Sequence, residues 1–106
     1  MKFGDIFLLA VTHADWTSAP DFHVIMTDAA GDKSWPVAGS TFILMHQVPV
    51  NAADSAAALK FFDWGYKNGK QMATDLDYVP MPDNVVALIE KTWKDKIKGA
   101  DDKPVF

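Results

Sequence analysis

Residues 51–86 read NAADSAAALKFFDWGYKNGKQMATDLDYVPMPDNVV, and this stretch predicts the fold more clearly than the rest of the chain. Asn51 is a residue type that begins helices, because its side chain accepts a hydrogen bond from an unpaired backbone amide. Nearly every position from 56 to 66 is apolar. The polar positions of this helix fall at i, i+3 and i+7, and they are Lys60, Asp63 and Lys67. Because these polar residues form one narrow line along the helix, we expect the rest of its surface to be buried against other elements.

The same stretch predicts how the first helix ends and where a second one begins. We expect the first helix to end at Gly69 in the left-handed conformation, with 70–75 adding a short helical turn. Residues 78–82 are expected to be extended, and Pro82 suits the first position of a helix over 82–98 that Gly99 closes. The apolar positions of the second helix are Val85, Val86, Ile89, Trp93 and Ile97.

Working outward, the N-terminal half predicts one more helix and a small sheet. Apolar residues at i, i+3, i+4, i+7 and i+8 predict an amphipathic helix over 3–14. Residues 22–27 form a short apolar run that we interpret weakly as a strand, and 28–33 form a turn. Residues 40–46 (STFILMH) are a continuous β-branched and apolar run, typical of a central strand that is buried on both faces. The predicted fold class is therefore α/β, with helices packed on a small sheet.

Length and composition favour one domain over 1–106 and exclude several classes of function. The chain has 106 residues, 49% of them apolar, a net charge of −4 and no cysteine. An acidic balance argues against a nucleic-acid partner, and the lack of cysteine excludes disulfides, thiolate zinc sites and cysteine nucleophiles. No apolar run approaches the roughly 20 residues that span a bilayer. The start carries Asp5 where a signal peptide should be positive, so we expect no signal peptide there.

No group of residues predicts catalysis or metal binding. His13, His23 and His46 lie in separate predicted elements, with none of the local spacings that metal sites use. Ser40 and Thr41 have no neighbouring base in the sequence. We therefore expect no catalytic residues, no metal ligands and no cofactor, and we do not expect an enzyme.

Two patterns leave a binding role open. Gly39, Ser40 and Thr41 could hold an oxyanion through hydroxyls and amides, although they lead into a predicted strand and not into a helix N-terminus. We interpret these hydroxyls as satisfying the local backbone. The helix aromatics could stack on a sugar or a base, but their helical spacing is more typical of a core. They are Phe61, Phe62, Trp64, Tyr66 and Trp93.

Three strings together resemble one known family. They are SWPVAGSTFILMH at 34–46, ALKFFDWGYKNGKQMATDLDYVPMPDNVV at 58–86, and the ending KPVF. In order and spacing they resemble the C-terminal third of the periplasmic phosphate-binding proteins of bacterial phosphate ABC transporters. The resemblance covers about residues 14–106, whereas residues 1–13, a predicted helix, match the family poorly.

The resemblance implies a partial lobe of a type II periplasmic binding protein. The family has two α/β lobes with the anion between them, which implies a strand over 40–46 near the return crossing and helices 51–68 and 82–98 on the first lobe. The family holds phosphate with amides, hydroxyls, an arginine and an aspartate from segments that precede this portion, and this chain has no arginine. We therefore expect no phosphate-binding residues in this segment, and little or no phosphate binding by the chain alone.

The partners that the resemblance implies are inorganic phosphate and an ABC permease, and the implied location is the periplasm. The alternative is a self-associating interaction module derived from the family. A strand buried on both faces would expose apolar side chains and unpaired edges without its neighbours, and a homo-oligomer would cover them.

Overall fold

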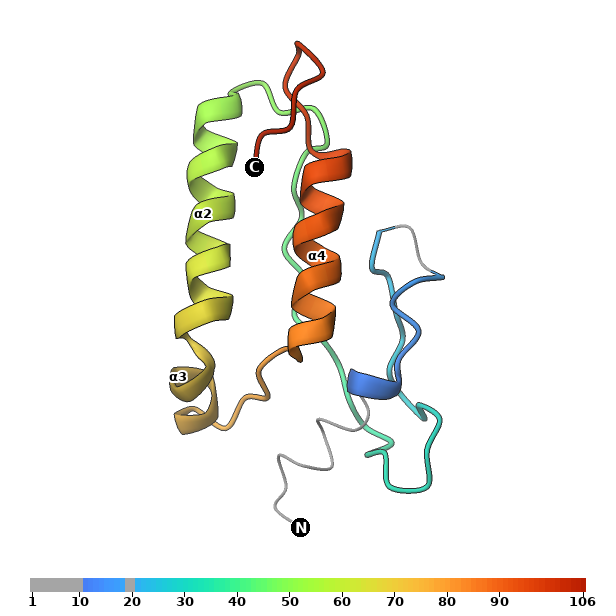
Figure 1. The fold of residues 1–106 in the computed structure, drawn as a ribbon. Coiled ribbons are helices and arrows are strands. Elements are labelled where there is room, and N and C mark those ends of the chain that lie inside the picture. The colour runs from blue at the N-terminus through green and yellow to red at the C-terminus, as the bar shows by residue number, and fades with distance from the viewer. Residues whose placement is uncertain (1–10, 19–20) are drawn as a thin grey trace.

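The computed structural model describes residues 11–18 and 21–106, and two long helices dominate this part (Figure 1). They are α2, Ala52–Asn68, and α4, Asp83–Lys96, with the short helix α3, Lys70–Asp75, between them along the chain. Helices α2 and α4 run in opposite directions, and ring stacking of Tyr66 on Trp93 joins them. Within the described residues, no helix is long and apolar enough to cross a membrane.

The start of α2 confirms the predicted N-cap. Asn51 Oδ1 accepts hydrogen bonds from the amides of Ala53, at 3.0 Å, and Asp54, at 3.3 Å. Asn51 Nδ2 in turn donates to Asp54 Oδ2 at 2.7 Å. Two amides that have no partner inside the helix are thus satisfied, and Asp54 complements the positive end of the helix dipole.

The end of α2 differs from the prediction. Gly69 has φ −89° and ψ −1°, so it is right-handed, and the expected left-handed end is wrong. Its amide donates to Gly65 O at 2.7 Å, and the chain turns directly into α3 without reversing. Glycine is still required here, because a Cβ at this position would lie 2.6 Å from the Gly65 carbonyl oxygen.

Helix α4 is shorter than predicted. Pro82 is its N-cap, with φ −61° and ψ 148°, so the helix begins one residue later than expected, at Asp83. It ends at Lys96 and not near Gly99, because Ile97 is extended, with φ −94° and ψ 103°. The residues after α4 bond to other segments: Lys98 N donates to Gln47 O at 2.8 Å, and Val105 N donates to Ile97 O at 3.1 Å. Because these backbone groups bond to other segments, they are not available for a further turn of α4.

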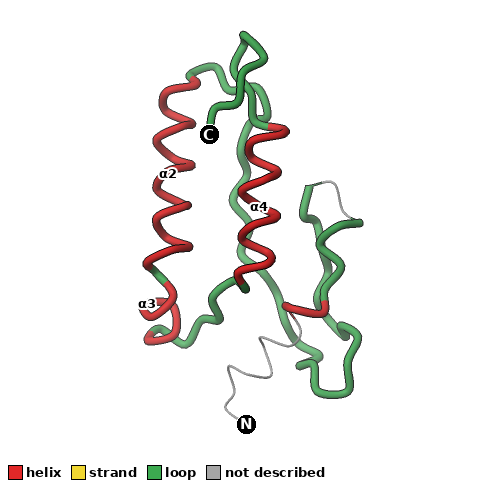
Figure 2. The backbone as a smooth tube through the Cα atoms, viewed as in Figure 1, coloured by secondary structure: helices red, strands yellow, loops and turns green. Residues whose placement is uncertain are grey.

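The predicted small sheet is absent from the described residues, so the α/β class was wrong for this part of the chain. Residues 22–27 and 40–46 are extended or irregular without strand pairing, and the described part is mostly helical (Figure 2). Within the described part, an isolated antiparallel β-bridge joins Lys98 and Pro104. A β-branched run becomes a strand only when another chain segment offers its backbone, and here none does.

The core lies between the N-terminal half and the first turn of α4. Five residues form it: Val11, Trp16, Met26, Ala38 and Val85. Trp16 Nε1 donates to Val11 O at 2.8 Å, so the indole N–H is satisfied inside the cluster. The helix predicted over 3–14 falls largely on residues 1–10, outside the described residues.

The burial predicted around α2 was wrong. Leu59 is the residue of α2 that is buried, whereas Phe61 is 66% exposed and Trp64 is exposed as well. The described chain therefore leaves much of an apolar helix in contact with solvent, which a finished core would cover.

Candidate functional site

A groove of about 570 Å³ lies among several segments of the described chain. Most of its lining comes from α2, α4 and the extended residues 40–47, which run alongside the two helices (Figure 1), and the rest comes mainly from 16–22, α3 and 79–81. Apolar side chains dominate its lining, among them Phe42, Leu44, Phe61, Phe62, Tyr66, Met81, Ile89 and Trp93. The groove therefore suits an apolar surface and not a dehydrated anion.

Aromatic rings join α2, α4 and the C-terminus along the groove. The Tyr66 and Trp93 rings stack with centroids 6.1 Å apart, and Phe106 meets Trp93 edge-on at 5.2 Å. Lys94 Nζ lies 5.9 Å from the centre of the Phe106 ring. Burial raises the pKa of the Tyr66 phenol, because the charged form loses solvation there.

The two lysines at the groove already have partners. Lys70 pairs with Asp83, and Lys96 is also engaged in an interaction. Ser40 Oγ lies 3.7 Å from Met26 Sδ, while Thr41 is exposed. An anion in the groove would therefore have to compete with Asp83 for Lys70.

Gly39, Ser40 and Thr41 lie in chain without regular secondary structure, where Ser40 is half-buried and its neighbours are exposed. The hydroxyl of Ser40 donates to Met26 Sδ, a side chain 14 positions away, so the expectation that it satisfies the local backbone is wrong for Ser40.

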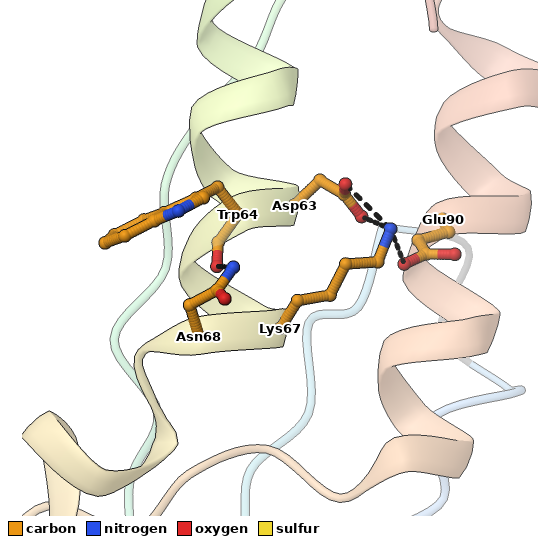
Figure 3. Close-up of polar contacts among 5 residues, drawn as sticks. All are labelled: Asp63, Trp64, Lys67, Asn68 and Glu90. Carbon is orange, nitrogen blue, oxygen red and sulfur yellow. Dashed lines mark hydrogen bonds and ion pairs between the residues drawn. The ribbon is translucent and has the colours of Figure 1, made fainter.

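Charged side chains of α2 and α4 meet between the two helices (Figure 3). Lys67 Nζ lies 2.7 Å from Asp63 Oδ1 and 3.9 Å from Glu90 Oε1. The hydrogen bond from Lys67 lowers the pKa of Asp63, and the same bond raises the pKa of Lys67. Beside them, Asn68 Nδ2 donates to Trp64 O at 3.0 Å.

The histidines give no metal centre in residues 11–18 and 21–106. No three ligand-type side chains gather there. His13 and His23 do line one small hollow of about 400 Å³ together with Asp15, a proximity that the sequence spacing did not predict. Asp15 Oδ1 accepts from Thr17 Oγ1 at 2.8 Å, and this bond is the main cause that lowers the pKa of Asp15. His46 lies apart from this hollow.

Sequence reasoning missed the exposed state of residues 40–46, because it treated them as a buried central strand. Phe42, Ile43 and Leu44 are 48%, 63% and 95% exposed. Their apolar run was the available signal, and it is the same signal that a buried strand gives.

Comparison with known proteins links this chain to phosphate-binding proteins. The chain matches no protein-family model. It is 42% identical over 103 residues to the phosphate-binding protein PstS of Pasteurella multocida, which is 97% of this chain and 30% of that protein. It is 41% identical over 95 residues to PstS of Xylella fastidiosa, which is 90% of this chain and 26% of that protein. For PstS of Haemophilus influenzae the identity is 40% over 95 residues, 90% of this chain and 28% of that protein.

The chain thus spans less than a third of the length of the curated relatives it matches. Identity above 40% over at least nine-tenths of the present sequence agrees with the resemblance seen in the three strings. Over this segment, the chain is homologous to the PstS phosphate-binding proteins.

Proposed function

We propose that this chain is a structural segment of a phosphate transport protein and that it binds little or no phosphate by itself. The homology to PstS supports the assignment to phosphate transport. The relatives are named for binding phosphate, so we assign the chain to binding and transport and not to catalysis. In this proposal inorganic phosphate, an ABC permease and the periplasm belong to the whole binding protein of which this chain is a part.

The observation that carries the proposal is the chemistry of the groove. Its lining is mainly apolar, and Lys70, which could attract an anion, is paired with Asp83. The chain has no arginine, so it lacks the forked donor that suits phosphate. A net charge of −4 further disfavours a dianion at low ionic strength. What this segment supplies is packing surface, not ligands.

Calorimetric titration of the 106-residue chain with inorganic phosphate tests this function. We expect no saturable heat up to roughly 1 mM phosphate, which corresponds to binding weaker than about −4 kcal/mol. The Pasteurella multocida PstS protein, titrated in the same buffer, is the positive control. Saturable micromolar binding by the 106-residue chain would show that its own residues form a phosphate site, and the proposal would then be abandoned.

A second candidate function is self-association, and the exposure of Phe42, Ile43 and Leu44 favours it. A second copy could cover this surface. Light scattering across a hundredfold range of protein concentration separates the two candidates. A mass of 11.7 kDa at all concentrations rules self-association out, and a stable mass of twice that value supports it.

A further inference from the structure

The junction between α2 and α3 contains an asparagine followed by glycine. The sequence has asparagine at positions 51, 68 and 84, and Asn68 is the one that precedes glycine. The nitrogen of the following residue can attack an asparagine side chain, provided that it approaches the side-chain carbonyl closely. Glycine has no Cβ to hinder this approach, whereas alanine follows Asn51 and the β-branched Val85 follows Asn84. Asn68 is therefore the asparagine of this chain with the highest intrinsic reactivity.

The reaction is deamidation, and its atoms balance with water alone. The Gly69 nitrogen loses its proton to solvent and bonds to Asn68 Cγ. The bond from Cγ to Nδ2 breaks, and the nitrogen leaves as ammonia with a proton from water. A second water then opens the cyclic imide at either carbonyl, which gives aspartate or isoaspartate at position 68. The mass of the chain rises by about 1 Da, and its charge becomes more negative.

The fold holds both reacting groups in other bonds. The Gly69 amide donates to Gly65 O at 2.7 Å. Asn68 Nδ2 donates to Trp64 O at 3.0 Å (Figure 3). Asn68 is also the last residue of α2, so its backbone is helical. Ring closure requires rotation about its Cα–C bond away from the helical value, and this rotation breaks the Gly69 hydrogen bond. The closed turn of the helix is therefore unreactive.

The same turn has little to keep it closed. The Asn68 side chain is exposed, and none of the residues of α3 is buried. Gly69 forms the N-cap of α3 without a side-chain hydrogen bond. Gly65 lies within the last turn of α2, and glycine has a low helix propensity. Terminal turns with few buried contacts open without unfolding of the whole chain.

We propose that Asn68 is a deamidation site in the folded chain, and that local opening of the last turn of α2 sets its rate. The modification acts in one direction. Aspartate places a negative charge at the negative end of the helix dipole and lacks the donor that bonds to Trp64 O. Isoaspartate lengthens the backbone between Asn68 and Gly69 by a methylene group, so the bond from Gly69 to Gly65 loses its register. Each product therefore weakens the junction between α2 and α3.

Peptide mass spectrometry tests the proposal. The 106-residue chain is incubated at slightly alkaline pH in buffer and in concentrated urea, and chymotryptic peptides are compared with a sample taken at the start. We expect conversion at Asn68 in both solutions, about tenfold or more slower in buffer, and at least about tenfold slower conversion at Asn51 and Asn84. Equal rates in buffer and in urea overturn the proposal. So does an unmodified Asn68 in buffer after many times the half-life in urea.

Gly65→Ala is the variant that changes the opening of the turn. A Cβ at position 65 meets no atom within 4 Å, whereas one at position 69 would lie 2.6 Å from Gly65 O. Alanine at position 65 should therefore stabilise the last turn and slow conversion of Asn68 in buffer about fivefold. In urea the rate should be unchanged, because no helix remains there. An unchanged rate in buffer contradicts control by this turn.

Met26→Ala separates local opening from unfolding of the whole chain. Met26 is 2% exposed and belongs to the core cluster, which contains no residue of α2. Loss of its side chain should raise the global unfolding constant, measured in urea titrations, by about thirtyfold or more. The rate at Asn68 in buffer should change by less than about threefold, because the turn opens by itself. A rate that rises in step with the unfolding constant overturns the proposal.

Discussion

At the scale of single residues, burial in α2 depends on position around the helix and not on apolar character. Leu59 is fully buried, whereas Phe61, two positions later, is two-thirds exposed. Positions two apart on a helix point in different directions, so a partner on one side covers the first and leaves the second in water. Leu59 is thus the most completely buried side chain of α2, although it lies outside the five-residue core cluster.

Leu59→Ala should lower the free energy of unfolding by about 2–5 kcal/mol, because the change removes buried methyl groups and leaves a cavity. Urea unfolding, followed by circular dichroism, measures the effect. Leu44→Ala makes the same substitution at a side chain that is 95% exposed in the isolated chain. It should change stability by no more than about 0.5 kcal/mol. A similar loss for both variants would contradict the burial assigned to Leu59.

The Asp63–Lys67 pair predicts how stability depends on pH. The pKa of Asp63 is lowered from its ordinary 3.8, so its contribution is complete above that pH and disappears as pH falls through the lower value in the folded state. The pKa of Lys67 is raised from 10.5, so its contribution is complete below that pH and disappears as pH rises through the higher value.

The test is the difference in thermal unfolding midpoint between the wild-type chain and Asp63→Asn. This difference should be largest, and constant, from about pH 5 to 9. It should shrink in acid and again in strong alkali, and added salt should reduce it, because Lys67 is exposed. Asp75→Asn is the control, since Asp75 bonds to the uncharged Gln71. A difference that is flat from pH 2 to neutrality would show that the pair does not stabilise the fold.

At the scale of elements, capping sets the boundaries of α2 more firmly than its apolar face does. Asn51 satisfies two amides and contacts Asp54, and all of these groups are local in sequence. The later boundaries rest on distant partners, since the end of α4 coincides with bonds from Lys98 to Gln47 and from Val105 to Ile97. Local signals therefore predicted the first boundary well and the last one less well.

Asn51→Ala should lower the free energy of unfolding by about 1 kcal/mol, because two amides at the start of α2 lose their acceptor. Asn51→Ser keeps an acceptor oxygen at the cap and should retain most of the stability. Urea titrations of the three chains, followed at 222 nm, provide the comparison. If Asn51→Ser were as damaging as Asn51→Ala, the cap would not be the cause.

At the scale of the whole molecule, contacts between distant segments hold an open arrangement together. The radius of gyration is 15.2 Å, whereas a compact domain of this length has about 13 Å. The Tyr66–Trp93–Phe106 stack connects α2, α4 and the last residue of the sequence given. Lys67 of α2 also approaches Glu90 of α4, with 3.9 Å between Nζ and Oε1.

Phe106→Ala should lower the free energy of unfolding by about 1–2 kcal/mol, because it removes a partly buried ring and an edge-to-face contact. Tryptophan fluorescence of Trp93 should also change, since its neighbour is lost. Phe61→Ala is the matched control: this ring is largely exposed, and alanine favours the helix. A smaller effect at Phe106 than at Phe61 would contradict the role of the stack.

The sequence by itself determined the helices and the family. Caps, apolar periodicity and glycine positions act within a few residues of the chain. For most of the ends of α2, α3 and α4, the predicted boundary therefore lies within one residue of the observed one. The homology to PstS follows from the same local strings. The sequence also predicts no phosphate-binding residues in this segment, since arginine is absent, and that remains a prediction.

Only the tertiary structure decided what residues 40–46 do. An apolar β-branched run has the same pattern whether its strand is paired or not, because pairing depends on a backbone supplied from elsewhere. In the described chain none is supplied, so Phe42, Ile43 and Leu44 remain exposed and the predicted sheet does not form. Contacts with distant segments also decided where α4 ends and which face of α2 is buried.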